Sequence, residues 1–241
     1  MNKLSIIIPC YNEEECLPHL FDRLNIVISK LKKNYSVDVI FVDDGSTDKT
    51  NELLHKYYGK KSNVRIIKHN KNKNLGAALK TGFRYAAGDF IATLDSDCTY
   101  NPKLILEMIK LMDKETDIIT VSPYHPKGRV NNVPRYRLFL SKTISWIYKI
   151  LLNQKIYTYT AMMRIYRKNV IKKVRFKADN FLGVTEIMIK AILYGYKVKE
   201  LPAELNVRKY GVSKMKTLSV IINHLGMIGK ILAYKTFGSK I

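Results

Sequence analysis

The most informative segment of the sequence is Phe90-Ile91-Ala92-Thr93-Leu94-Asp95-Ser96-Asp97. Its apolar run, 90–94, has the length and composition of a buried strand, and two carboxylates follow where that strand ends. Open α/β sheets bind ligands beyond the carboxyl ends of their strands. Two carboxylates leaving one strand can reach a hard cation, and such a cation can neutralise a diphosphate leaving group. An Asp-x-Asp pair is common by chance, so its position at a strand end carries the argument.

Outward from this stretch, short apolar runs alternate with helical patterns. The first half predicts strands at 4–8, 37–42, 64–68, 90–94 and 117–122. Helices are expected between them, at 14–33, 49–58, 75–86 and 102–114. Strands joined by helices of this length indicate right-handed βαβ units. We therefore expect an α/β fold with a mainly parallel, Rossmann-like sheet flanked by helices.

The second half is less regular. Residues 123–134 have the Gly, Pro and Asn content of a loop. Further on, helices are expected near 138–152 and 184–195, and a strand at 197–201. We expect one domain over 1–214, with halves 1–122 and 123–214, followed by an amphipathic helix within 215–241. That helix is expected either to lie on a membrane or to pack on the domain.

Composition excludes several classes of protein. The chain has 241 residues, 46% of them hydrophobic, which is too apolar for a disordered polycation. Three cysteines favour a reduced compartment. Neither a signal peptide nor a run of about 18 apolar residues is found, so no transmembrane helix is expected. Gly-x-Gly-x-x-Gly and Walker-type loops are missing after the first strand, which disfavours dehydrogenases and P-loop enzymes.

The net charge of +22 is concentrated in the second half of the chain. Residues 1–122 hold 18 basic and 16 acidic residues, whereas 123–241 hold 24 basic and only four acidic ones. A basic excess of this kind suits nucleic acid, an anionic membrane or a phosphate-bearing substrate. Nucleic acid is disfavoured, because the basic half has no helix-turn-helix, zinc or RNP-type signature.

Four motifs in order give a resemblance to a known family. They are IIPCYNEE at 7–14, VDDGSTD at 42–48, NLGAA at 74–78 and LDSD at 94–97. Their order and spacing resemble family 2 glycosyltransferases of the GT-A fold. Within that family the chain is most similar to the catalytic domains of dolichyl-phosphate mannosyltransferases and related polyprenyl-phosphate glycosyltransferases.

The resemblance implies roles for residues in the donor half. Four residues would line the nucleoside pocket: Pro9, Tyr11, Glu13 and Asp44. Asp95 and Asp97 would hold a divalent metal (Mg or Mn) and the diphosphate, with Asp97 the principal catalytic ligand.

In the second half the resemblance is looser. RKYGVSK at 208–214 is similar to a closing segment that clamps phosphates, through Arg208 and Lys214. Arg137 with Ser141 resembles a pair that holds the lipid phosphate. Glu186 is the candidate catalytic base or sugar-orienting carboxylate; an ordinary helix glutamate is the alternative.

Three departures from the family pattern concern the metal and the acceptor. Thr99 stands where relatives often carry a metal-ligating Gln. Ser122-Pro123-Tyr124 replaces Ser-Arg-Tyr, so an acceptor-phosphate arginine is missing, for which Arg129 or Arg135 is a candidate substitute. The segment TYTAMMR at 158–164 keeps only Thr160 and Arg164 of the family's acceptor-side pattern.

The resemblance implies an inverting transfer of a hexose from a nucleotide sugar to a polyprenyl (dolichyl-type) phosphate. Mannose from GDP-mannose is favoured, with glucose from UDP-glucose next. A lipid phosphate is already anionic and needs positive charge rather than a base. A glycan hydroxyl as acceptor remains the alternative, and would need an acid such as Glu186 as base. We expect a peripheral protein on the cytoplasmic face of an anionic membrane, with a separate membrane partner protein left open.

Overall fold

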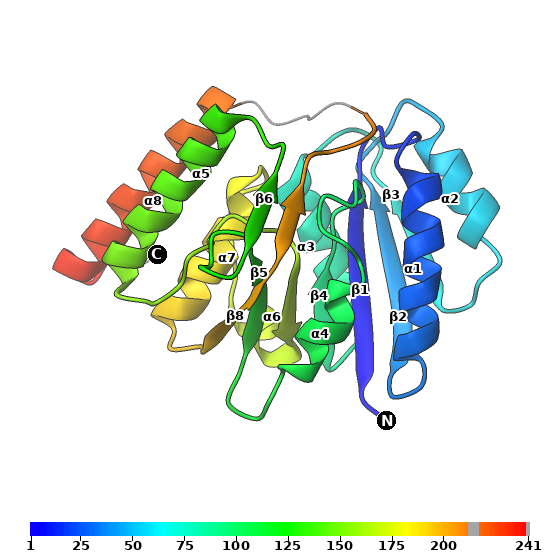
Figure 1. Ribbon diagram of the computed structural model, residues 1–241, viewed down its shortest axis with the longest axis horizontal. Helices are drawn as coiled ribbons and strands as arrows, with labels where there is room; N and C mark the ends of the chain where they lie inside the picture. The colour runs from blue at the N-terminus through cyan, green and yellow to red at the C-terminus, as the bar shows by residue number, and fades with distance from the viewer. Residues whose placement is uncertain (212–216, 240–241) are drawn as a thin grey trace.

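A seven-stranded sheet forms the centre of the computed structural model, which describes residues 1–211 and 217–239, and helices cover both faces of this sheet (Figure 1). The sheet strands are β1 (Lys3–Cys10), β2 (Ser36–Asp43), β3 (Val64–Lys68), β4 (Phe90–Thr93), β5 (Ile118–Ser122), β7 (Arg164–Arg167) and β8 (Val198–Pro202). The helices are α1 (Leu17–Leu31), α2 (Thr50–Tyr58), α3 (Leu75–Tyr85), α4 (Leu104–Lys110), α5 (Arg135–Leu152), α6 (Lys168–Lys173), α7 (Leu182–Leu193) and α8 (Thr217–Phe237). The expected α/β fold is confirmed.

The strand order is β3-β2-β1-β4-β7-β5-β8, and β1 pairs in parallel with both β2 and β4. The chain therefore adds strands on one side of β1 and then on the other. The gap between β1 and β4 at the carboxyl ends is a topological switch point, where such sheets bind ligands. The register brings Cys10 opposite Asp43, so the segments that follow both strands start side by side.

One central strand is not predicted by the sequence. β7 runs antiparallel between β4 and β5, and its first residue is the fully buried Arg164. The guanidinium of Arg164 donates to the carbonyl oxygens of Val184 and Tyr159 and to Thr120 Oγ1. These bonds offset the desolvation of a buried cation. Arginine is usually a surface residue. Here Arg164 instead connects β5, α7 and the segment before β7 through these hydrogen bonds.

The expected loop at 123–134 contains a short strand, β6 (Arg129–Asn131), which pairs in parallel with β9 (Glu204–Asn206). Three-residue strands carry too little periodicity to be recognised from sequence. This small sheet places the segment 205–208 beside the carboxyl edge of the large sheet.

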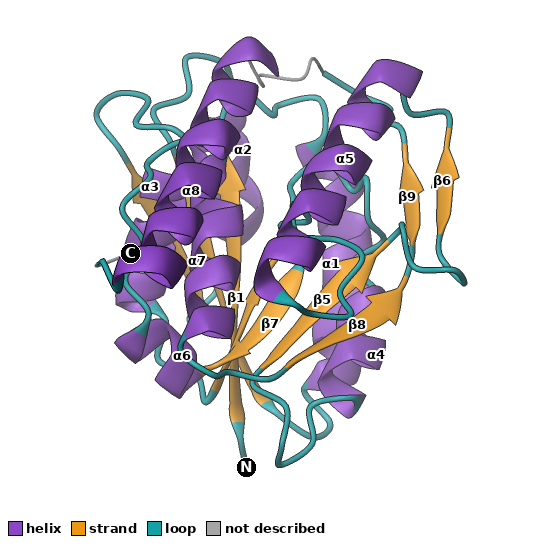
Figure 2. Cartoon of the chain, turned by 90° about the vertical axis from the view of Figure 1, so that its left-hand side faces the viewer, coloured by secondary structure: helices purple, strands orange, loops and turns teal. Residues whose placement is uncertain are grey.

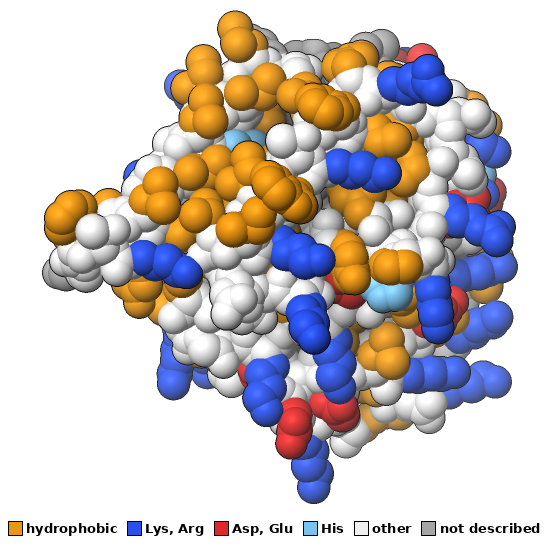
Figure 3. Space-filling view, turned by 60° about the vertical axis from the view of Figure 1, so that its left-hand side comes forward, with side chains coloured by type: hydrophobic (Ala, Val, Ile, Leu, Met, Phe, Trp, Pro, Cys, Tyr) orange, Lys and Arg blue, Asp and Glu red, His pale blue; other side chains and the backbone are white. Residues whose placement is uncertain are grey.

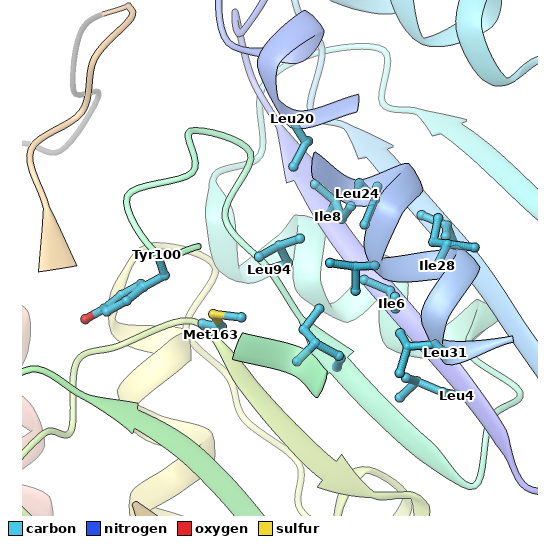
Figure 4. Close-up of a cluster of buried hydrophobic side chains, with 14 of the residues drawn as sticks. Leu4, Ile6, Ile8, Leu20, Leu24, Ile28, Leu31, Leu94, Tyr100 and Met163 are labelled. Carbon is cyan, nitrogen blue, oxygen red and sulfur yellow. The ribbon is translucent and has the colours of Figure 1, made fainter. Parts of the chain in front are cut away.

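Apolar cores lie on both faces of the sheet. On one face, the apolar side of α1 packs on alternate residues of β1, with Leu20, Leu24, Ile6 and Ile8 among them (Figure 4). On the other face, α3, α6 and α7 cover a second core. Burial on both faces explains why β1 reads as a continuous apolar run.

The helices α5 and α8 lie side by side and pack on α7, outside the second core (Figure 2). Between them, the hydroxyl of Tyr148 lies 2.9 Å from Nδ1 of the buried His224. By length and composition α8 is a candidate membrane span, with a mean hydropathy of 1.3, which differs from the expectation of no such helix. Most of α8 is exposed, since only 17% of its most apolar window is buried.

Candidate active site

A cavity of about 800 Å³ opens at the switch point, beyond the carboxyl ends of β1, β2 and β4. Its lining includes every expected donor-side residue that the structure describes, namely Pro9, Tyr11, Glu13, Asp44 and Asp95. Asp97, Arg137 and Arg208 also line it. Residues more than 100 positions apart in the sequence therefore meet in one place.

Asp44 is a buried carboxylate in the wall of this cavity. Its backbone N–H donates to Cys10 O at 2.8 Å, which ties the end of β2 to the end of β1. Its Oδ1 lies 2.6 Å from His69 Nδ1 and accepts from Lys73 N, while Oδ2 accepts from Asn72 Nδ2 at 3.0 Å. These bonds fix the side chain as a preorganised acceptor.

His69 is a site residue that sequence reasoning missed. Its Nε2 lies 2.9 Å from Thr81 Oγ1, so the ring connects Asp44 to helix α3. The signal available in the sequence was the polar run 69–74, which follows β3 and so begins at the same sheet edge as Asp44. Asn72 and Asn74 of this run line the cavity, as does Phe181 from the segment before α7.

Asp95 and Asp97 follow β4 at the opposite side of the switch point. Asp97 Oδ1 accepts from Thr99 N at 3.0 Å, so the turn after the strand fixes the second carboxylate. Burial raises the pKa of Asp95, and the neighbouring charge of Asp97 raises it further, against the opposing effect of Arg208. Added positive charge would stabilise such a carboxylate in its ionised form.

Arg208 bridges two elements of the site. Its Nε donates to Asp97 Oδ2 at 2.9 Å, and one terminal nitrogen donates to Glu13 Oε1 at 2.8 Å. Burial lowers the pKa of the guanidinium, but the charges of Asp97 and Glu13 outweigh burial and raise it. Burial also raises the pKa of Glu13, and Arg208 partly offsets that rise. Arg208 therefore stays protonated and places a positive charge between the carboxylates of Asp97 and Glu13.

Arg137 enters the cavity from the first turn of α5. Its Nε donates to the hydroxyl of Tyr136 at 3.1 Å, and Tyr136 is also a cavity residue. Ser141 lies one turn further along α5, but its Oγ lies 2.8 Å from Thr160 Oγ1 and it is not part of the lining. Arg129 and Arg135 do not line the cavity either. Among these four residues, only Arg137 lines the cavity.

The structure places Glu186 outside the cavity lining. This side chain on α7 is buried, accepts from Lys177 N and Ala178 N, and pairs with Lys190 Nζ at 2.8 Å. Burial raises the pKa of Glu186, but the bonds from Lys190 and the two amides outweigh it, so that the net shift is downward. Lys214, expected to bind phosphate, lies outside the described residues.

Residues 177–181 connect α7 to the cavity, and Glu186 fixes this segment by accepting hydrogen bonds from its first two backbone amides. Asp179 O accepts from Ala77 N in the first turn of α3, at 3.1 Å. Gly76 approaches this segment so closely that a Cβ atom would lie 2.3 Å from Ala178 O. A glycine is therefore required where α3 meets the segment, and Phe181, which follows it, reaches the cavity.

The carboxylates of Asp95 and Asp97 could hold a divalent metal. Within residues 1–211 and 217–239, no group of three or more His, Cys, Asp or Glu side chains is placed to bind one alone. Mg²⁺ needs fewer protein ligands, because it commonly binds one or two carboxylates together with substrate phosphates and water. Two adjacent acids in a cavity with room for a diphosphate fit this kind of site.

Curated relatives match nearly the whole chain. A dolichol-phosphate mannosyltransferase of Pyrococcus furiosus is 32% identical over 98% of this chain and 68% of its own length. A polyprenol monophosphomannose synthase of Mycolicibacterium smegmatis is 31% identical over 87% of this chain and 80% of its own.

Solved structures share the fold. Glucosyl-3-phosphoglycerate synthase from Mycobacterium tuberculosis in complex with UDP has a TM-score of 0.70 at 18% identity, and covers 95% of this chain and 80% of its own. Other crystal structures of that enzyme hold UDP with Mn²⁺ or Mg²⁺. The family described as glycosyl transferase family 2 matches residues 5–175. With most of its length matched and the four motifs gathered around one cavity, the chain belongs to glycosyl transferase family 2.

Proposed function

We propose that the chain transfers a hexose from a nucleotide sugar to a polyprenyl phosphate, with inversion at the anomeric carbon. Mannose from GDP-mannose is the favoured donor, and UDP-glucose is next. The observation that carries the proposal is the meeting of Asp95, Asp97, Arg208 and Arg137 in one cavity. The names of the two curated relatives, each more than 30% identical, support this acceptor and this sugar.

On the donor side, the fixed carboxylate of Asp44 takes the polar edge of the nucleoside. Asp95 and Asp97 face the diphosphate, and a divalent cation bound to them would neutralise charge on the leaving group. Arg208 is placed to contact the same phosphates once it leaves Asp97.

On the acceptor side, Arg137 provides a positive charge for the lipid phosphate. A phosphate oxygen attacks the anomeric carbon, the bond from that carbon to the nucleoside diphosphate breaks, and the diphosphate leaves with the electron pair. The attacking oxygen is already ionised, so the step requires positioning rather than a general base.

A glycan hydroxyl as acceptor receives less support. This alternative needs a carboxylate free to accept a proton, and Glu186 is buried outside the cavity with Lys190 as its partner. The acids in the lining are Glu13, Asp44, Asp95 and Asp97. Glu13 is hydrogen-bonded to Arg208, and Asp44 is hydrogen-bonded to His69 and Asn72. We assign Asp95 and Asp97 to the metal.

Membrane association follows from the outer face of α5 and α8. Large apolar side chains there are 57–72% exposed: Phe139, Trp146 and Ile150 on α5, and Leu218, Ile222 and Leu225 on α8. Figure 3 shows hydrophobic side chains gathered on this side of the molecule, with Lys and Arg around them. An exposed apolar patch rimmed by cations suits a peripheral site on an anionic bilayer, and the cytoplasmic face is the side we propose.

A transfer assay tests the proposal. Purified protein is incubated with Mg²⁺ or Mn²⁺, GDP-mannose or UDP-glucose, and a short-chain polyprenyl phosphate. Release of nucleoside diphosphate should require the lipid phosphate, and NMR of the product should show the anomer opposite to that of the donor. Transfer to an oligosaccharide but not to the lipid would overturn the acceptor assignment, and retention of configuration would overturn the mechanism.

A further inference from the structure

A second cavity, of about 690 Å³, lies on the face of the sheet that α3, α6 and α7 cover (Figure 1). We call it the rear cavity and define it by its lining, which runs from Lys80 to Ala86 on α3, along α6 and the segment 174–177, to Ile187 on α7. It shares no lining residue with the active-site cavity. The volume is in the range of small-molecule sites.

The rear cavity is strongly basic. Six of its lining residues are cationic, and none is acidic: Lys80, Arg84, Lys168, Lys172, Arg175 and Lys177. Two have partners within the protein, since Lys80 Nζ pairs with Asp179 at 2.7 Å and Lys168 Nζ donates to Ala87 O at 2.9 Å. Across the described residues no carboxylate pairs with the other four. Uncompensated like charges around a cleft attract an anion.

The remaining lining is apolar. Phe83, Ile91 and Ile187 belong to the core under α3 and α7 and also face the rear cavity. The rings of Phe83 and Phe176 meet edge to face with centroids 6.2 Å apart and form an aromatic wall of the cavity. A ligand that fits therefore needs an apolar portion as well as negative charge.

We propose that the rear cavity binds a phosphate ester that carries an apolar group. Arg84 and Arg175 would take the phosphate, because guanidinium groups bind it in a bidentate manner. Phosphate fits better than a single carboxylate, since four cations at the site pair with no carboxylate of residues 1–211 and 217–239. The inference does not depend on the proposed transferase activity.

Site-resolved NMR tests this inference. The 241-residue chain with labelled Ile and Met methyl groups is titrated with n-octyl phosphate below its critical micelle concentration. The methyl groups of Ile171 and Ile187 report on the rear cavity, and that of Met162 reports on the active-site cavity. Saturating shifts are expected at Ile171 and Ile187, and Arg84→Glu/Arg175→Glu should weaken this binding by at least roughly tenfold.

Matched controls separate charge, site and apolar contributions. Lys30→Glu/Lys33→Glu makes the same charge change on exposed residues at the end of α1 and should leave the affinity unchanged, as should Arg137→Ala in the active site. Octyl glucoside should cause no saturating shift, and pyrophosphate should bind more weakly than octyl phosphate. Equal binding by octyl glucoside, or equal losses in the Lys30/Lys33 control, would overturn the phosphate site. Pyrophosphate binding as tight as octyl phosphate would overturn the role of the apolar wall.

Discussion

The guanidinium of Arg208 is hydrogen-bonded to Asp97, with Nε 2.9 Å from Oδ2. A cation from the segment after β9 thus pairs with the second carboxylate of the LDSD motif after β4. The same carboxylate is the one that we propose as a metal ligand, so the metal and Arg208 would compete for it.

Arg208→Gln should therefore bind Mn²⁺ more tightly than the wild type in the absence of nucleotide. Loss of one charge-assisted hydrogen bond and of a nearby positive charge predicts a gain of roughly tenfold, while the transfer rate falls. Calorimetric titration measures the first quantity and the transfer assay the second. Lys209→Gln, at the neighbouring exposed position, is the matched control. Mn²⁺ affinity that is unchanged in Arg208→Gln would exclude the competition.

Asp97→Asn should abolish transfer while the protein stays folded. The substitution keeps the shape of the side chain but removes the anionic oxygens that a hard cation needs. We expect the rate to fall by on the order of 10³-fold or more, as when electrostatic stabilisation of a leaving group is lost. Circular dichroism checks the fold, and Asp22→Asn on the exposed side of α1 is the control. A variant that keeps most of its activity would refute the metal assignment.

Arg137→Ala should raise the KM for polyprenyl phosphate by roughly tenfold or more and leave the KM for the nucleotide sugar nearly unchanged. The reason is that Arg137 enters the cavity from α5, whereas the donor motifs follow β1, β2, β3 and β4. Arg135→Ala removes the same charge from the same helix but outside the lining. Equal effects on both substrates, or an equal effect of Arg135→Ala, would contradict an acceptor-specific role.

Glu186→Gln should reduce stability rather than remove a catalytic base. It leaves Lys190, whose side chain is 3% exposed, without its anionic partner, which predicts a loss of about 3 kcal/mol in unfolding free energy. Urea denaturation measures this loss, and Glu186→Gln/Lys190→Met should recover much of it. The pH–rate profile should keep its shape. If the variant were as stable as the wild type and its pH–rate profile lacked the fall in rate at acidic pH, Glu186 would instead be identified as the base.

His224 should make the protein less stable at mildly acidic pH. Burial lowers the pKa of His224 to about 4 from its ordinary 6.5. Between these values the unfolded chain binds a proton that the folded protein does not, so stability falls as the pH falls. The expected contribution between pH 7 and pH 5 is about 2 kcal/mol. Urea denaturation of the wild type and of His224→Gln at both values should differ by this amount. Equal pH dependence would rule the contribution out.

The donor side of the site was predictable because its residues lie in local motifs. Pro9 lies at the end of β1, whereas Tyr11, Glu13, Asp44 and Asp95 follow β1, β2 or β4, and parallel strands end at one edge of a sheet. The resemblance to the family named these residues, and the parallel topology accounts for why they meet at one sheet edge. The polar run 69–74 marks this sheet edge, but the contact of His69 with Asp44 depends on how that loop folds back, which the run does not specify.

The acceptor side was harder to predict, because its elements are short or contain charged residues. β7 begins with the buried Arg164, and β6 and β9 have three residues each. Their pairing is set by contacts between segments distant in the sequence rather than by periodicity. The same limit applies to Glu186, whose partners Lys177 and Ala178 lie in an irregular segment.

The position of β7 has a consequence for how the molecule is assembled during synthesis. The strand is inserted between β4 and β5, and α5 intervenes between β5 and β7 in the chain. Until residues 164–167 are synthesised, β4 has an unpaired edge and β5 has no partner strand, because its other neighbour, β8, comes later still in the chain. The donor motifs are synthesised before β7, so the sheet beneath them is incomplete until β7 has paired with β4. Neither half, cut near residue 122, is a complete module, because β4 and β5 of the first half pair with β7, which belongs to the second half.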